Sequence, residues 1–298
     1  MIIICNFTKK RAMNRTKNAL LIIDAQNDFC KPGAPLYVQG AEKDNERLAS
    51  WIKNNASEID HISYTLDTHQ INDISHPSLW RDKSGKMVAP HTIIRYQDLL
   101  DGNYYPVIYR QKIQEYIKTI EDIASEENKN GIAFPVLFHY IWPEHCILSS
   151  EGAELSKVIS DALIYWARQN PGFTYNAWVK GTNPLTEHFG IFQAQVSYVE
   201  FPETQLNQKL IQTLEKYDNV FFAGQAKSHC VATTLKQALY LAPNLASKFV
   251  ILEDAMSNVV VPGGPDFAAI AQPIYDLAKQ KGVRFETTKT ANLIPAMA

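Results

Sequence analysis

The sequence predicts a doubly wound α/β fold, in which a parallel sheet has helices on both faces. Continuous apolar segments alternate along the 298-residue chain with segments of amphipathic helical periodicity. Strands that are buried on both faces have continuous apolar sequences, and their alternation with helices is typical of parallel sheets. Such sheets bind their ligands at the carboxyl ends of the strands, so we look for functional residues there.

Six short apolar segments are the expected strands, and they cover residues 19–24, 61–66, 132–138, 174–179, 219–224 and 248–254. Helical periodicity begins at Lys43 and recurs over residues 155–168, 205–216, 231–241 and 267–280. Residues 79–131 break this alternation, because loop-like sequence is followed there by a charged helical pattern over 109–129. We therefore expect a single domain over residues 1–298 with an insertion at about 79–131.

Composition narrows the function classes. The formal net charge is −2 and no long block of like charge occurs, which argues against a nucleic-acid groove or a membrane-surface face. No apolar segment approaches the roughly 18 residues that a membrane-spanning helix needs. The widely spaced cysteines fit no zinc-finger pattern and indicate a reduced, cytoplasmic protein; they are Cys5, Cys30, Cys146 and Cys230.

Four polar residues stand where expected strands end. Asp24 is the last residue of the expected strand at 19–24. Asp67 follows the strand at 61–66, and Lys180 follows the strand at 174–179. Cys230 lies six residues beyond the strand at 219–224 and opens a helix. Any one of these residues is explained equally well as a loop charge or a helix cap. Together they are what a site at the carboxyl edge of the sheet would contain.

Cys230 has two interpretations on local sequence alone. At a helix N-terminus the macrodipole favours a thiolate, and unpaired backbone N–H groups there can hold an oxyanion. The alternative is a buried cysteine that fills space in the core. The adjacent His229 is not expected to be its base, because neighbouring helix residues point apart.

Histidines near Asp67 suggest a metal site. In an extended segment Asp67 and His69 point the same way, so both can reach one ion. His76 lies within loop reach, and His145 in the segment WPEHC can complete the set. Mixed histidine and carboxylate ligands suit zinc, iron or manganese. Ordinary surface residues remain the simpler interpretation for the other histidines, which are His61, His91, His139 and His188.

Several longer segments carry a resemblance to a known family. They occur in the order LLIIDAQNDFC, LDTH with SHPSLW, WPEHCILSSEGAEL, WVKGT, GQAKSHCVATTLKQAL and ILEDA, and they span most of residues 19–255. With these segments the chain resembles the isochorismatase-like cysteine hydrolases, and among them the nicotinamidases. The resemblance implies a three-layer fold with about six parallel strands. It also implies a metal-dependent amidohydrolase that cleaves nicotinamide to nicotinate and ammonia through a cysteine thioester.

The resemblance assigns roles residue by residue. The implied catalytic triad is Asp24, Lys180 and Cys230, and a cis peptide with an oxyanion hole is implied at Gln225 and Ala226. The implied ligands of one divalent metal ion, zinc before iron or manganese, are Asp67, His69 and His145, with His76 as a further candidate. The implied substrate-binding aromatics are Phe29, Trp142 and Phe192, whose faces suit a flat heteroaromatic ring.

Two departures from the family leave alternatives open. The insertion separates the D-x-H segment from WPEHC, which makes His91 an alternative ligand to His145. Where nicotinamidases usually show a tyrosine–serine–small–phenylalanine patch, residues 188–192 read HFGIF. The substrate is therefore nicotinamide or a different small amide or carbamoyl compound. A vinyl ether and a non-catalytic binding role are weaker alternatives, and family members are often homo-oligomers.

Overall fold

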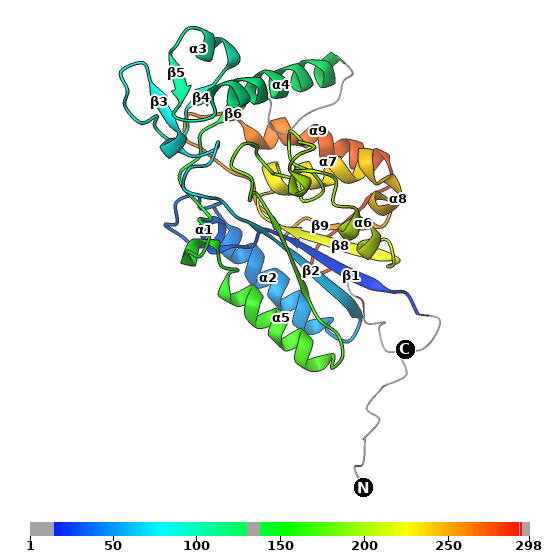
Figure 1. The fold of residues 1–298 in the computed structure, drawn as a ribbon. Coiled ribbons are helices and arrows are strands. Elements are labelled where there is room, and N and C mark those ends of the chain that lie inside the picture. The colour runs from blue at the N-terminus through cyan, green and yellow to red at the C-terminus, as the bar shows by residue number, and fades with distance from the viewer. Residues whose placement is uncertain (1–14, 130–137, 292, 294–298) are drawn as a thin grey trace.

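A six-stranded parallel sheet lies at the centre of the computed structural model, with helices on both faces (Figure 1). The model describes residues 15–129, 138–291 and 293. The sheet order is β10-β9-β8-β1-β2-β7, and every neighbouring pair runs parallel. The strands are β1 (Asn18–Ile23), β2 (Ile59–Asp67), β7 (Asn176–Lys180), β8 (Asn219–Gly224), β9 (Phe249–Leu252) and β10 (Arg284–Glu286).

Strand β1 explains why the sheet needs cover on both faces. All six of its residues are buried. Because side chains alternate along a strand, Leu21 and Ile23 pack into one hydrophobic cluster while Leu20 and Ile22 pack into another. The continuous apolar sequence of this strand therefore serves two cores at once.

Two groups of helices provide this cover (Figure 1). On one face, α2 (Ala41–Asn54) packs against α5 (Lys157–Gln169), and Trp51 and Trp166 belong to that cluster. On the other face lie α6 (Gln208–Leu214), α7 (Ala232–Leu241), α8 (Pro243–Ala246) and α9 (Phe267–Gln280). Short helices complete the connections: α1 (Asn27–Cys30), η1 (Pro77–Leu79), η2 (Glu151–Ala153), η3 (Pro202–Thr204) and η4 (Lys227–Val231).

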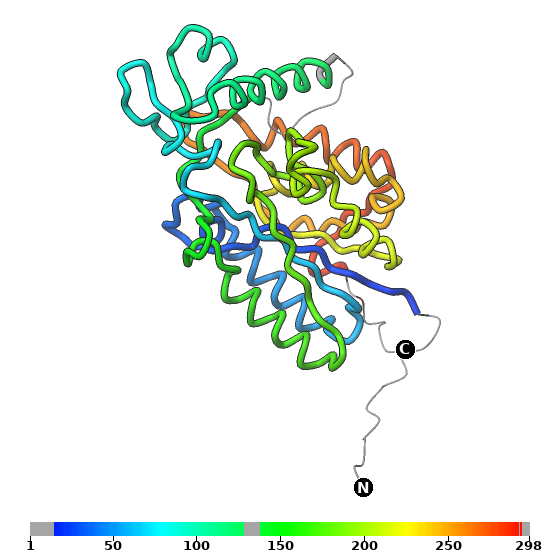
Figure 2. Tube along the Cα trace, in the orientation of Figure 1, coloured from blue at the N-terminus to red at the C-terminus, as the bar shows by residue number. Residues whose placement is uncertain are grey.

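The segment between β2 and α5 contributes most of a further hydrophobic cluster, which includes Trp80, Ile117 and Ile141 and also Leu185 from beyond β7. Its elements are β3 (Trp80–Asp82), β4 (Ile93–Ile94), α3 (Tyr96–Leu100), β5 (Tyr104–Pro106), α4 (Arg110–Lys129) and β6 (His139–Tyr140). β3 pairs with β5, and β4 pairs with β6, in both cases antiparallel. Figure 2 traces the chain from the carboxyl end of β2 into this segment and back through β6 toward α5.

The predicted doubly wound fold is confirmed, and five of the expected strands lie in the sheet within two residues of their predicted bounds. The expected strand at 132–138 lies, apart from its last residue, outside the described residues. The sixth strand of the sheet is instead β10, which we did not predict. β10 has only three residues, all exposed or half-buried, so no apolar segment marks it.

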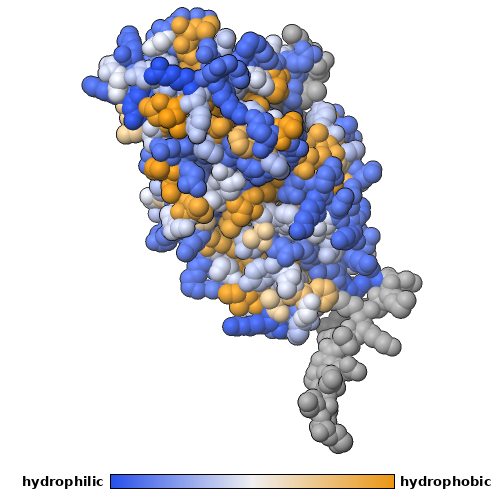
Figure 3. All heavy atoms as spheres, viewed as in Figure 1, coloured by the Kyte–Doolittle hydropathy of each residue, from blue (hydrophilic) through white to orange (hydrophobic). Residues whose placement is uncertain are grey.

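The molecular surface in Figure 3 shows apolar residues in small groups among polar ones. Among the described residues, no helix combines the length and apolar character needed to cross a membrane.

Candidate functional site

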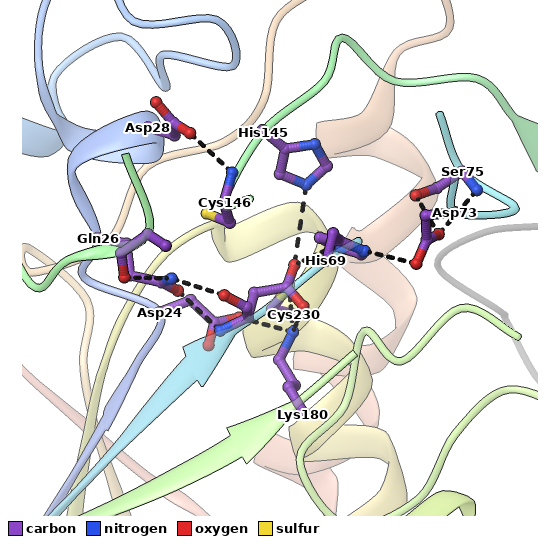
Figure 4. Close-up of polar contacts among 12 residues, drawn as sticks. Asp24, Gln26, Asp28, His69, Asp73, Ser75, His145, Cys146, Lys180 and Cys230 are labelled. Carbon is purple, nitrogen blue, oxygen red and sulfur yellow. Dashed lines mark hydrogen bonds and ion pairs between the residues drawn. The ribbon is translucent and has the colours of Figure 1, made fainter. Parts of the chain in front are cut away.

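Parallel strands bring the polar residues of the predicted site together at one edge of the sheet. Asp24 follows β1, and Asp67 and Lys180 are the last residues of β2 and β7, where they stand opposite each other in register. Cys230 lies in η4, just beyond β8, and β8 is the other neighbour of β1. Figure 4 shows Asp24, Lys180 and Cys230 pointing toward one another.

Lys180 is the centre of this cluster. Its Nζ lies 2.9 Å from Asp24 Oδ2, 3.0 Å from Asp67 Oδ1 and 3.7 Å from Cys230 Sγ. Burial opposes the charge on Lys180, but the two carboxylates hold its pKa well above the ordinary value. The side chain is therefore a fixed cation that faces both carboxylates and the thiol.

Asp24 is held by the neighbouring strand. It has a φ of 41°, in the left-handed region that residues other than glycine seldom adopt. The Thr65 hydroxyl donates to Asp24 Oδ1 and accepts from the Asp24 N–H at 3.0 Å. Burial raises the pKa of Asp24, and Lys180 opposes that rise. A carboxyl group with these neighbours can accept and return a proton.

The environment of Cys230 differs from the expectation drawn from its helix position. Acceptor oxygens of Asp24 and Asp67 and the Cys230 sulfur all lie within 4.8 Å of one another. Burial raises the pKa of Cys230 well above its ordinary value, Lys180 opposes this, and both carboxylates add to it. Desolvation and the two carboxylates therefore favour the thiol over the thiolate in the resting side chain.

The turn between β8 and Cys230 approaches β1 closely. A Cβ at Gly224 would lie 2.0 Å from the Ile23 carbonyl oxygen, and Gly224 has a φ of +121° that also requires glycine. The Gln225–Ala226 peptide bond is cis, at the position implied by the family resemblance. The Gln225 side chain donates to Asp44 Oδ2 at 2.9 Å and accepts from the Ser257 N–H at 3.2 Å. These contacts fix the backbone that leads into η4.

A buried amide fixes Asp67. Gln26 Oε1 accepts from the Asp67 N–H at 2.8 Å, and Gln26 Nε2 donates to the Asp67 carbonyl at 2.7 Å. Burial opposes ionisation of Asp67, yet His69 and Lys180 hold its pKa well below the ordinary value. Asp67 is therefore an anion shared between the Lys180 cluster and the neighbouring histidines.

Three histidines gather beside Asp67, and one nitrogen from each lies within 4.8 Å of the others; they are His69, His76 and His145. His69 Nε2 lies 3.1 Å and His145 Nε2 3.8 Å from Asp67 Oδ2. His76 Nε2 lies 3.3 Å from His145 Nδ1. Burial, with the other histidines, lowers the pKa of His76 to about 3, so the ring is neutral at neutral pH and one of its nitrogens has a free lone pair. The donor set fits a divalent metal ion.

Backbone contacts bring His145 to this cluster from a distant part of the sequence. The His69 N–H donates to the Cys146 carbonyl at 3.0 Å, and the Leu148 N–H donates to the His69 carbonyl at 2.9 Å. Asp28 Oδ2 accepts from the Cys146 N–H at 2.7 Å (Figure 4). By contrast, His91 is exposed and lies beside Tyr140, so it does not join the three histidines.

A small cavity is lined by Cys230 and by His145 of the histidine cluster. Its lining residues are Phe29, Leu36, Asp67, Trp142, His145, Glu187, Phe189, Ala226, His229, Cys230 and Val259. Phe29 and Trp142, two of the predicted aromatic residues, are among them. Phe192 does not line the cavity; it is fully buried in the core, and its N–H donates to Gln237. The aromatic residue of that segment which lines the cavity is Phe189.

Comparison with known proteins gives one consistent answer. No family model matches the chain. The nicotinamidase of Escherichia coli (strain K12) is 24% identical over 223 residues, which cover 75% of this chain and 76% of that protein. The chain is therefore similar in sequence to a nicotinamidase.

Solved structures show the same fold. The nicotinamidase/pyrazinamidase of Acinetobacter baumanii is 18% identical, with a TM-score of 0.57 over 93% of this chain and 98% of its own. The yeast nicotinamidase is 18% identical, with a TM-score of 0.58 over 90% of this chain and 98% of its own. The fold of this chain is thus shared with these two structures over at least 90% of its length.

Two residues that line the cavity were not predicted from the sequence. Burial raises the pKa of Glu187 to about 8, and its Oε1 has no hydrogen-bond partner among the described residues. Burial lowers the pKa of His229 to about 3, and its ring packs edge-on against Trp142. Neither residue stands at a strand end, which is the signal that marked the others. His229 lines the cavity beside Cys230, although the helical spacing predicted that the two would point apart.

Proposed function

We propose that this protein is a metal-dependent cysteine amidohydrolase that converts nicotinamide to nicotinate and ammonia. The observation that carries the proposal is the buried cluster of Asp24, Lys180 and Cys230, of which Cys230 lines a cavity together with aromatic side chains. The sequence likeness to a nicotinamidase supports the same reaction. Structural relatives include the yeast nicotinamidase bound to the inhibitor nicotinaldehyde and a protein from L. infantum in complex with nicotinate.

The first chemical step follows from the charges around the sulfur. Because burial raises the pKa of both the Cys230 thiol and the Asp24 carboxyl, Asp24 takes the thiol proton as the sulfur attacks the carboxamide carbon. The Lys180 ammonium, 3.7 Å from the sulfur, stabilises the developing thiolate. The oxyanion is held by the backbone N–H groups of Ala226 and Cys230, and one such donor contributes roughly 3 kcal/mol.

The later steps return the proton. Asp24 donates it to the departing nitrogen, so that ammonia leaves and a Cys230 thioester remains. Asp24 then accepts a proton from water as the water attacks the thioester, and it passes this proton to the departing sulfur, which restores the thiol and the Asp24 carboxylate. The released acid loses its own proton to solvent as nicotinate. Throughout, Lys180 holds Asp24 in place at 2.9 Å.

We propose Asp67, His69, His76 and His145 as the ligands of one divalent metal ion, with Zn²⁺ the ion that best suits three imidazoles and a carboxylate. A bound divalent ion supplies a positive centre that attracts and orients a polar atom of the substrate ring. Phe29 and Trp142 line the same cavity and offer apolar surface to the ring.

Ammonia release from nicotinamide, pyrazinamide and a series of aliphatic amides tests the substrate. The proposal predicts that the zinc-loaded protein releases ammonia from nicotinamide and pyrazinamide and much more slowly from the aliphatic amides, which lack a ring. Release from an aliphatic or carbamoyl compound without release from nicotinamide would contradict the proposed substrate. Asp24→Asn serves as the background, because it removes the base and retains the shape of the side chain.

A further inference from the structure

Asp73 is a buried carboxylate beside the histidine cluster, and none of the steps above uses it. The exposed fraction of the residue is 1%. Its Oδ2 lies 3.1 Å from His69 Nδ1, and a dashed line in Figure 4 marks this contact. Burying a carboxylate costs free energy unless the group is paired, and the partner of this carboxylate is a histidine of the cluster.

The two nitrogens of His69 face opposite partners. Nδ1 faces Asp73, whereas Nε2 lies 3.1 Å from Asp67 Oδ2, on the side of the histidine cluster. His145 Nε2 lies 3.8 Å from the same Asp67 oxygen. A ring in this position can ligate an ion through Nε2 only if its remaining proton is on Nδ1. In the structure Nε2 makes a hydrogen bond with Asp67, and an ion bound there would replace the proton between them. A carboxylate at Nδ1 would then hold the remaining proton on that nitrogen.

The segment that carries Asp73 is fixed by contacts of its own. Asp73 Oδ1 accepts from the Ser75 N–H at 3.0 Å and from the Ser75 hydroxyl at 2.8 Å. The Ile74 N–H donates to the Pro184 carbonyl at 2.9 Å, and the Ile74 carbonyl accepts from His139 Nε2 at 2.9 Å. One oxygen of Asp73 therefore closes the turn, and the other remains for His69.

We propose that Asp73 is a positioning residue of the metal site, which orients His69 and keeps its Nε2 available as a ligand. The inference rests on the metal site proposed above and deepens it. Carboxylate partners of this kind typically change metal affinity by 10–100-fold when they are removed. Asp73 does not touch the substrate cavity, so its effect reaches the reaction only through His69.

The chain contains a matched control for this role. Asp82 Oδ1 accepts from the Ser84 N–H at 2.8 Å and from the Ser84 hydroxyl at 2.7 Å, which is the same turn that Asp73 makes with Ser75. Asp82 is partly exposed and lies in β3 of the inserted segment. Asp82→Asn therefore changes an equivalent turn without changing the histidine cluster.

The test measures the affinity for Zn²⁺ alone, by competition with a chromophoric chelator, together with the Tm of each metal-free protein. Asp73→Asn keeps an acceptor oxygen for Ser75 and withdraws the second carboxylate oxygen from His69. The proposal predicts a Kd for Zn²⁺ that is 10–100-fold weaker in Asp73→Asn and within twofold of wild type in Asp82→Asn. Ser75→Ala, which loosens the turn and leaves the carboxylate, is predicted to stay within threefold of wild type.

Each outcome separates the two proposals. Wild-type protein that binds no Zn²⁺ would overturn the metal site itself. Wild-type binding with an unchanged Kd in Asp73→Asn would overturn the role of Asp73 alone, as would an equal loss in Ser75→Ala. If the metal-free Tm shows that Asp73→Asn fails to fold, Asp73→Ser removes the same oxygen with a smaller side chain. An unchanged Kd in that variant would equally contradict the proposal.

Discussion

Replacement of Lys180 by methionine tests the charge arrangement at the centre of the site. Lys180 is fully buried and is the cation between Asp24 and Asp67, at 2.9 and 3.0 Å. Breaking a buried ion pair by removing one partner costs about 3–5 kcal/mol, because an uncompensated charge remains. In a chain of this size that loss lowers the Tm by roughly 10 °C.

The pH dependence gives the prediction its sign. In the wild type, burial opposes ionisation of Asp67, but His69 and Lys180 hold its pKa well below the ordinary value. Ionised Asp67 therefore stabilises the fold at any pH above the ordinary carboxyl pKa. Removal of Lys180 withdraws a cation that lowers the pKa of both carboxyls, so both pKa values rise relative to wild type and the charged forms oppose folding more strongly. The stability difference between wild type and Lys180→Met therefore grows as the pH rises through about 4 and shrinks in acid.

The assay is thermal and urea unfolding of the metal-free proteins between pH 3 and pH 8, with Lys157→Met as the control. Lys157 pairs with Asp161 at 2.7 Å but is exposed, and such surface pairs contribute roughly 0–1 kcal/mol. A Tm of Lys180→Met equal to that of Lys157→Met at neutral pH would refute the reasoning. So would a difference from wild type that does not depend on pH.

Two further variants test the supporting contacts. Burial raises the pKa of Glu187 to about 8, so the ionisation of this residue opposes folding as the pH rises toward that value. Glu187→Gln should therefore become increasingly more stable than wild type from pH 5 to pH 9, by about 1 kcal/mol or more at the upper end. Equal Tm values of the two metal-free proteins across that range would contradict this. Gln26→Ala leaves two buried backbone groups of Asp67 without their partner and should lower the free energy of unfolding in urea by roughly 2–4 kcal/mol. The control is Gln205→Ala, which removes an exposed glutamine that also donates to two backbone carbonyls. This variant should change the free energy of unfolding by less than about 1 kcal/mol. An equal loss of stability in both variants would be evidence against the Gln26 contact.

Strand ends made much of the site predictable from the sequence. Asp24, Asp67 and Lys180 directly follow or end apolar segments, and parallel strands place such residues at one edge. Their contacts at 2.9 and 3.0 Å are a direct consequence of that topology. The residues around them are less regular in sequence, because loops have no periodicity that fixes which side chain points inward.

The aromatic segment after Lys180 illustrates this limit. The family resemblance implied Phe192 as a substrate contact, but Phe192 N–H donates to Gln237 and its ring enters the core, which leaves Phe189 at the cavity. Glu187 also enters the cavity from this segment, although a charged residue in a loop is ordinarily expected at the surface. Which residue of the loop faces inward is decided by tertiary contacts such as that with Gln237.

Short elements were the other limit. Strand β10 (Arg284–Glu286) has no apolar segment, because it lies at the edge of the sheet and its residues are exposed or half-buried. The position of β10 in the sheet follows from its pairing with β9, in a register that places Phe285 opposite Ile251. Pairing of this kind depends on the completed sheet and leaves little trace in a local sequence.

Ammonia release by Cys230→Ala, compared with Cys30→Ala, tests the central claim most directly. Both cysteines are buried, but only Cys230 lines the cavity, within 3.7 Å of Lys180 Nζ. The account predicts that zinc-loaded Cys230→Ala releases ammonia from nicotinamide at no more than the background rate, whereas Cys30→Ala keeps most of the wild-type rate. Ammonia release by Cys230→Ala at the wild-type rate would contradict it.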